Sequence, residues 1–102
     1  MEKKEDLAKK LEIVVDDEVA VGAYINLALI NHSPEEFTMD FIYVPPNAPK
    51  AKLRARVISC PAHTKRFLMA LQENLRRYEE KFGAINIGPN LQWTSFDNVG
   101  HS

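Results

Sequence analysis

The first stretch of alternating hydrophobic positions predicts a β-strand over residues 21–31, VGAYINLALIN. Apolar side chains occur on both of its faces, which is typical of a strand that is covered on both sides. A buried helix is the alternative interpretation, but the β-branched and aromatic content favours a strand. The turn residues 32–35, HSPE, end it. One face carries Val21, Ala23, Ile25, Leu27 and Leu29, and the other carries Tyr24, Ala28 and Ile30.

Two further strands are predicted around a proline-rich loop. Residues 36–43 alternate as a half-buried strand does, and residues 45–49, PPNAP, lack too many N–H groups to lie inside a sheet. In residues 50–58 every second position is a cation: Lys50, Lys52, Arg54 and Arg56. In a hairpin, odd positions then oppose odd ones, so Phe37, Met39, Phe41 and Tyr43 should form one apolar layer with Ala51, Leu53, Ala55 and Val57. Glu36 and Asp40 should share the opposite face with the four cations.

A long amphipathic helix is predicted after the third strand. Pro61 suits a first helical turn, and Gly83 suits the C-terminal cap. About 22 residues at a rise of 1.5 Å give roughly 33 Å, enough to cross the whole meander. The charged pairs Glu73–Arg77 and Arg76–Glu80 have helical spacing. The apolar stripe consists of Phe67, Leu68, Leu71, Leu75, Tyr78 and Phe82.

The ends of the chain are predicted to contribute less. Residues 1–11 are charge-dense and are interpreted as a flexible N-terminal arm, and residues 88–102 as a C-terminal tail that is also flexible. Short extra strands are conceivable at 12–16 and 84–87. The single domain therefore spans 12–87, an α+β fold in which an antiparallel β-meander of three to four strands precedes one long amphipathic helix, arranged in two layers.

Composition argues against some classes of function but does not identify one. The chain of 102 residues has a formal net charge of −1, which argues against a dedicated duplex-DNA binder. The one cysteine, Cys60, cannot form an intramolecular disulfide, and neither a secretory signal nor a membrane-length apolar run is visible. A cytoplasmic, soluble protein is the expectation.

Several segments resemble a small prokaryotic family of unknown function. They are HSPEEF at 32–37 with Asp40-Phe41, the strand end Arg56-Val57-Ile58, PAHTKR at 61–66, and LQENL at 71–75 with Tyr78-Glu79 and Phe82-Gly83. The resemblance covers about residues 24–85, and the tail after Ile87 lies outside it. It implies a small stand-alone α+β domain without an established activity, and it carries no catalytic residues.

The cation stripe is the sharpest functional candidate. Four positive charges about 7 Å apart along a strand would roughly match a single-stranded nucleic-acid backbone, with Tyr24 or Tyr43 as a stacking platform. The alternative is a solvated or partner-facing surface, because Glu36 and Asp40 would neutralise part of the stripe. Tyr43 also belongs to the apolar face by its parity.

Cys60 and His63 are the candidates for enzyme chemistry. A thiol at a helix N-terminus can act as a nucleophile, but a Cys–His pair also needs an orienting group and an oxyanion site, and the sequence offers neither. Two donors are too few for a structural zinc, and the acids 16–18 lack the EF-hand spacing. We therefore expect no catalytic residues, no metal site, no cofactor and no enzymatic activity. A thiol enzyme built on Cys60 is the third hypothesis.

The second apolar face of the first strand points to a partner. One helix covers one side of a small sheet, so Tyr24, Ala28 and Ile30 need another cover. A symmetric homodimer is the favoured solution, and a protein partner or the tail is the alternative. The function hypothesis is a non-enzymatic homo-oligomeric interaction or regulatory module. The runner-up is a single-stranded nucleic-acid binder that uses Lys50, Lys52, Arg54 and Arg56, and no membrane association is expected.

Overall fold

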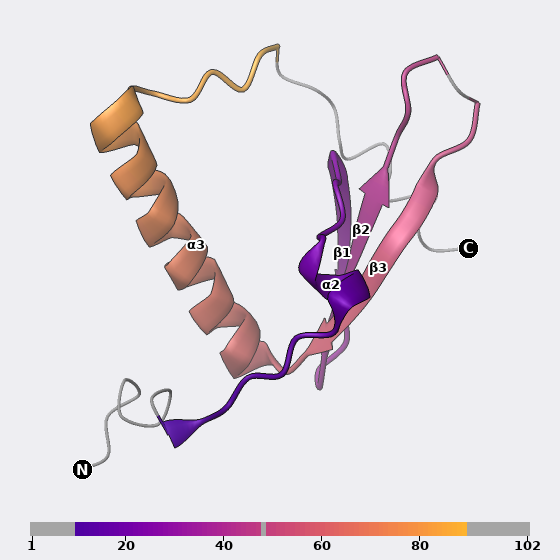
Figure 1. Cartoon of the computed structure of the whole chain (residues 1–102), viewed down its shortest axis with the longest axis vertical. Coiled ribbons are helices and arrows are strands. Elements are labelled where there is room, and N and C mark those ends of the chain that lie inside the picture. Colours follow the sequence, from indigo (N-terminus) through magenta and orange to yellow (C-terminus); the bar gives the residue numbers. More distant parts are fainter. Residues whose placement is uncertain (1–9, 48, 90–102) are drawn as a thin grey trace.

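The fold is an antiparallel three-stranded sheet followed by one long helix that stands away from it (Figure 1). We describe it from a computed structural model, which describes residues 10–47 and 49–89. The short helix α2 covers Asp17–Ala20, and the strands are β1 (Leu27–His32), β2 (Phe37–Tyr43) and β3 (Lys52–Ser59). Helix α3 covers Pro61–Phe82. The strand order is β1-β2-β3, so the α+β meander and its helix are confirmed.

The first strand is shorter than its hydrophobic pattern suggests. It begins at Leu27 rather than at residue 21. Gly22 adopts a positive φ of 82°, and the side chain of Asn26 takes the place of a backbone pair in the ladder. The amide Nδ2 of Asn26 donates to the carbonyl oxygen of Val44 at 2.9 Å, and Oδ1 accepts from the N–H of Val44 at 2.8 Å. This pair of bonds continues the β1–β2 ladder for one more step without a strand.

The chain outside the sheet and α3 differs from the predicted extra strands. Residues 12–16 form no strand, and the acidic residues that follow them begin helix α2 instead. Residues 84–87 also form no strand. The predicted arm and tail lie largely outside the described residues.

A register shift separates the two halves of the β2–β3 hairpin. Met39 opposes Val57 and Phe41 opposes Ala55, as the predicted odd-to-odd pairing requires. Beyond Phe41 the register slips by one residue, so Ile42 opposes Leu53 and Tyr43 opposes Lys52. The predicted single apolar layer is therefore right for the half of the hairpin near Ser59 and wrong near the loop, because a β-bulge at this step leaves one residue of β3, Arg54, without a partner.

The sheet has two faces, which we name after residues of its central strand. Directly opposed residues share a face, so the Met39 face comprises Ala28, Ile30, His32, Phe37, Met39, Phe41, Ala55, Val57 and Ser59. The Asp40 face comprises Leu27, Leu29, Asn31, Thr38, Asp40, Ile42, Leu53, Arg56 and Ile58. Ala28 and Ile30 thus lie on the same face as Met39, and not on a second side of the sheet as predicted.

Helix α3 does not cover the sheet of its own chain. It leaves β3 after a single linking residue, Cys60, whose backbone is extended, and the distance between helix and sheet grows toward Phe82 (Figure 1). We expected the helix to lie across the meander, but only its first turns come near the strands. Among the described residues Met39 alone is a buried apolar residue, with 5% of its surface exposed.

Candidate functional site: two uncovered apolar surfaces

The apolar stripe of α3 forms as predicted but has no cover. Its six side chains project from one side of the helix, and all of them are exposed: Phe67, Leu68, Leu71, Leu75, Tyr78 and Phe82. Leu71, in the middle of the stripe, keeps 46% of its surface exposed. An apolar stripe of this width on a helix is normally buried against another element. The stripe is therefore a surface that awaits a partner.

An open groove runs along the C-terminal half of the stripe. It has a volume of about 490 Å³ and is bounded by Leu71, Leu75, Tyr78, Phe82 and Ile85, with polar side chains at its rim. The rings of Tyr78 and Phe82 stack at a tilt with their centroids 4.9 Å apart. Lys81 places its ammonium 5.4 Å from the centre of the Phe82 ring. These contacts shape the far end of the helix without burying it.

The opposite side of α3 is held by a network of ion pairs. Arg76 lies 2.7 Å from Glu73 and 2.5 Å from Glu80, and Arg77 lies 3.0 Å from Glu73. Hydrogen bonds from Arg76 and Arg77 lower the pKa of Glu73 to about 2, because they stabilise its ionised form. The network adds Glu73–Arg76 to the two predicted pairs, and one of its members, Arg77, also lies at the rim of the groove.

The Met39 face is the second surface, and it is uncovered at its two outer strands, although Met39 itself is buried. On β1 the residues of this face are exposed whereas their neighbours on the Asp40 face are half-buried, and Ile30 keeps 59% of its surface exposed. Val57, on β3, is also exposed. The predicted contact residues Ala28 and Ile30 thus lie on an open face. Tyr24 precedes β1 and is also exposed, and its ring contacts Tyr43 of the same face edge-to-face, with the two ring centroids 6.0 Å apart.

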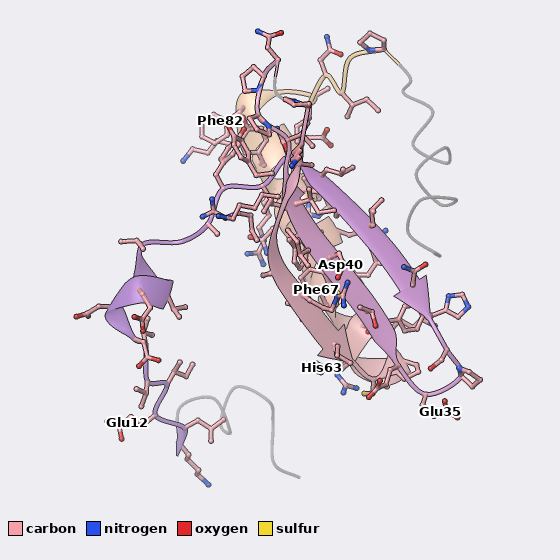
Figure 2. All side chains as sticks on the ribbon, turned by 90° about the vertical axis from the view of Figure 1, so that its right-hand side faces the viewer. Glu12, Glu35, Asp40, His63, Phe67 and Phe82 are labelled. Carbon is pink, nitrogen blue, oxygen red and sulfur yellow. The ribbon has the colours of Figure 1, made fainter. Side chains whose placement is uncertain are left out.

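The two surfaces meet where α3 leaves the sheet. A cavity of about 350 Å³ lies there, bounded by Met39, Phe41 and Val57 of the sheet and by His63 and Phe67 of the helix, together with Ile58 and Ser59. Figure 2 shows the labelled His63 and Phe67 near this end of the sheet, with Phe82 at the other end of the helix. Helix and Met39 face therefore form the two sides of a wedge that is narrow at Cys60 and wide at Phe82.

The four cations of the predicted stripe do not share one face. Arg56 is on the Asp40 face, where its Nε donates to Oδ1 of Asp40 at 2.7 Å and its Nη2 to Oδ2 at 3.0 Å. Lys52 opposes Tyr43 and is therefore on the Met39 face, on the other side of the sheet. The expected cross-strand neutralisation is confirmed for Asp40 and Arg56. Glu36 precedes β2 and instead takes part through its backbone in the turn at Ser33.

The remaining cations are less organised than the stripe suggested. Lys50 precedes β3, and Arg54 has no residue opposite it at the register shift. Within the described part of the chain, no ion pair involves Lys50, Lys52 or Arg54. A continuous track for a nucleic-acid backbone is not formed on one face. The nucleic-acid role of these residues stays a prediction.

Cys60 is exposed at the start of α3 and acts through its backbone. Its carbonyl oxygen accepts hydrogen bonds from the N–H and the hydroxyl of Thr64, both at 2.9 Å, while its thiol makes no capping bond. His63 contacts Arg66, with 3.4 Å between Nδ1 and Nη2. Over residues 10–47 and 49–89 no group of three or more His, Cys, Asp or Glu side chains is placed to hold a metal ion.

The segment before the sheet is an exposed apolar surface that was not predicted from the sequence. Between Leu11 and Val21 the large apolar side chains are all exposed, namely Leu11, Ile13, Val14, Val15, Val19 and Val21. The segment runs away from the sheet with Glu12 at its distal part (Figure 2). The only sequence signal was the clustering of valine and isoleucine, which we interpreted as a strand.

The fold and its surfaces define a small α+β domain whose apolar helix stripe and apolar sheet face are both uncovered within one chain. The chain belongs to the family described as "Protein of unknown function (DUF3467)", whose model matches residues 1–87. The match is wider than the resemblance at 24–85, and it leaves out the tail after Ile87, as that resemblance did. No curated protein and no solved structure shows a significant match. In the described residues, no helix is both long and apolar enough to cross a membrane.

Proposed function

We propose that this chain is the subunit of a homodimeric, non-enzymatic interaction module. The observation that carries the proposal is that Met39 is the sole buried apolar residue among those described, although the chain has the apolar content of an ordinary globular protein. A stable domain of this size needs a core, because burial of apolar surface offsets the conformational entropy lost on folding. A second copy supplies the missing surface.

The exposed area supports the same proposal. The six stripe residues and the exposed part of the Met39 face together offer on the order of 800 Å² of apolar surface, which matches one side of a standard interface. Monomeric proteins rarely leave apolar patches of that size uncovered.

The surroundings of Cys60 and His63 support a role without catalysis. Cys60 accepts hydrogen bonds through its carbonyl oxygen, and the side chain of His63 contacts a cation, Arg66. A nucleophilic cysteine needs a base within hydrogen-bond reach and a third group that orients the base.

We place the module in the cytoplasm, which is compatible with its single exposed cysteine.

The solution mass of the full chain tests this proposal. Light scattering at tens of micromolar should give twice the 11.6 kDa of the chain, about 23 kDa. Leu71→Glu, in the stripe, should weaken the dimer, because a carboxylate would be buried in the apolar interface. The matched control is Met69→Glu, which changes an exposed apolar residue on the other side of the same helix and should leave the mass unchanged. A wild-type monomer at this concentration would overturn the proposal.

A further inference from the structure

The junction between β3 and α3 sets the direction of the helix. A single residue, Cys60, separates the last residue of β3 from Pro61, whose ring fixes its own φ. The carbonyl group of Cys60 is held by two hydrogen bonds from Thr64. With so short a link, the helix leaves the sheet at an angle that the first turn itself determines. The wedge is therefore a feature of the chain's local structure.

The two sides of the wedge match each other in length. The 22 residues of α3 span about 33 Å, and the eight residues of β3 span about 26 Å. A helix with its side chains is about 10 Å across. The wedge is narrow at the start of α3, where Phe67 lines the cavity, and open at the C-terminal end of the helix (Figure 1). A helix entering from the open end would meet Ile30 and Phe41 on one side and the groove at Leu75 on the other.

The two sides also match in charge. The stripe and the strand pairs at the centre of the Met39 face are apolar, and the cation of that face, Lys52, lies beyond the register shift. The Arg76–Glu80 pair lies on the opposite side of α3, and the Asp40–Arg56 pair lies on the opposite face of the sheet. Bringing stripe and face together would therefore bury no charge of these pairs.

We propose that α3 of each copy packs across the Met39 face of the other copy, so that the two wedges interlock. The inference rests on the proposed homodimer and specifies its contact. Each chain carries one helix stripe and one sheet face, and an exchange of helices satisfies both surfaces in both chains at once. Such a self-complementary contact closes with two-fold symmetry and uses the stripe and the Met39 face of both chains.

A second copy fits the wedge better than an unrelated partner does. An unrelated partner would have to bring both a helix that suits the Met39 face and a surface that suits the stripe. The chain itself already contains that pair in the right proportion. The exposed apolar residues before the sheet, among them Ile13 and Val14, extend away from their own sheet and are available to the same partner.

Cross-linking between differently labelled chains tests this arrangement. Chains with Ile30→Cys carry ¹⁴N, chains with Leu75→Cys carry ¹⁵N, and both carry Cys60→Ser so that the introduced thiols alone react. After the two are refolded together, a short bis-maleimide should give a covalent dimer that links the light peptide of position 30 to the heavy peptide of position 75. In the matched control, Glu80→Cys replaces Leu75→Cys and places the thiol on the charged side of α3. That pair should not cross-link.

The other outcomes separate this inference from the homodimer itself. A particle of about 23 kDa without a 30–75 cross-link would overturn the helix exchange and leave the dimer standing, for example through the edge of β1 or β3. A monomer by light scattering would overturn both. A chain that carries both Ile30→Cys and Leu75→Cys and forms only an internal link would show that α3 closes on its own sheet. If Leu75→Cys does not fold, as judged by circular dichroism, Tyr78→Cys takes its place on the stripe.

Discussion

The side chain of Asn26 makes the two hydrogen bonds that the backbone of a strand residue would make. Its amide group both donates to and accepts from the backbone of Val44, and its own N–H donates to the carbonyl oxygen of Ile42 at 3.0 Å. Replacing Asn26 by Ala removes the two side-chain bonds, each of which contributes about 0.5–1.5 kcal/mol in proteins. Because water reaches this site, we expect a loss of about 1 kcal/mol in the free energy of unfolding, measured by urea titration.

A conservative variant distinguishes the bonds from the loss of the side chain. Asn26→Asp keeps the oxygen that accepts from the N–H of Val44 but loses the donor to the carbonyl oxygen. Its stability should lie between that of the wild type and that of Asn26→Ala. Equal stability of Asn26→Ala and the wild type would show that solvent replaces both bonds without cost.

The Asp40–Arg56 pair makes stability depend on pH. The hydrogen bond from Arg56 holds the pKa of Asp40 below its ordinary value of 3.8, and the side chain of Asp40 is only 15% exposed. A depressed pKa contributes stability above the unfolded value and loses it as the pH falls through the folded value. In urea titrations from neutral pH to below pH 3.8, the midpoint should therefore fall more for the wild type than for Asp40→Asn. Parallel curves would contradict this assignment.

At the scale of single residues, the sequence predicted which charges can pair but not all of their faces. Asp40 and Arg56 are on opposed positions before the register shift, so strict alternation placed them correctly. Lys52 and Leu53 come after the shift, and each is on the face opposite to the predicted one. A β-bulge adds one residue to a strand without changing the alternation of residue types, so the pattern of KAKLRARVI contains no trace of it.

Among the elements, α3 contains the strongest electrostatic network. Glu73 accepts hydrogen bonds from both Arg76 and Arg77, and its pKa is lowered from 4.5 to about 2. The stability that this carboxylate contributes is present above pH 4.5 and is lost between 4.5 and about 2. Helicity measured by circular dichroism should therefore decline more over this interval in the wild type than in Glu73→Gln. Added salt should reduce the difference in this decline between the wild type and Glu73→Gln, because these side chains are solvent-exposed and salt screens their charges. A difference that does not respond to salt would contradict this explanation.

Elements with strong local signals were predictable, and those that depend on partners were not. Strand β2 and the start and end of α3 follow from alternation, from Pro61 and from Gly83. The helix ends were predicted where they are observed, and the alternation placed the start of β2 one residue early, at Glu36. The start of β1 was placed too early, because apolar residues before Leu27 resemble a strand even though β2 has no strand residues left to pair with them. Helix α2 went unrecognised because its four residues, DEVA, are too few to show a helical period.

For the whole molecule, hydrophobic patterning shows that a surface must be covered but not which chain covers it. The stripe of α3 was read correctly from its spacing, and the helix was then assumed to cross its own sheet. The short link at Cys60 directs it away instead, and that angle depends on backbone geometry that residue periodicity does not encode. The predicted need for a second copy came from Tyr24, Ala28 and Ile30. In the structure the same need is larger, because the stripe and the Met39 face both lack a cover.

Coupling between assembly and folding gives the last prediction. If the interlocked dimer supplies the core, unfolding also separates the chains, and its midpoint must rise with protein concentration. Each tenfold increase should add about 1.4 kcal/mol to the apparent free energy of unfolding per dimer, which is RT ln 10 at 25 °C. Urea titrations followed by circular dichroism at several concentrations measure this. Met69→Glu should retain the full dependence of the urea midpoint on protein concentration. Leu71→Glu should need a higher protein concentration than the wild type to reach the same midpoint. A wild-type midpoint that is independent of concentration would mean that one chain completes its own core, with α3 closed against the Met39 face.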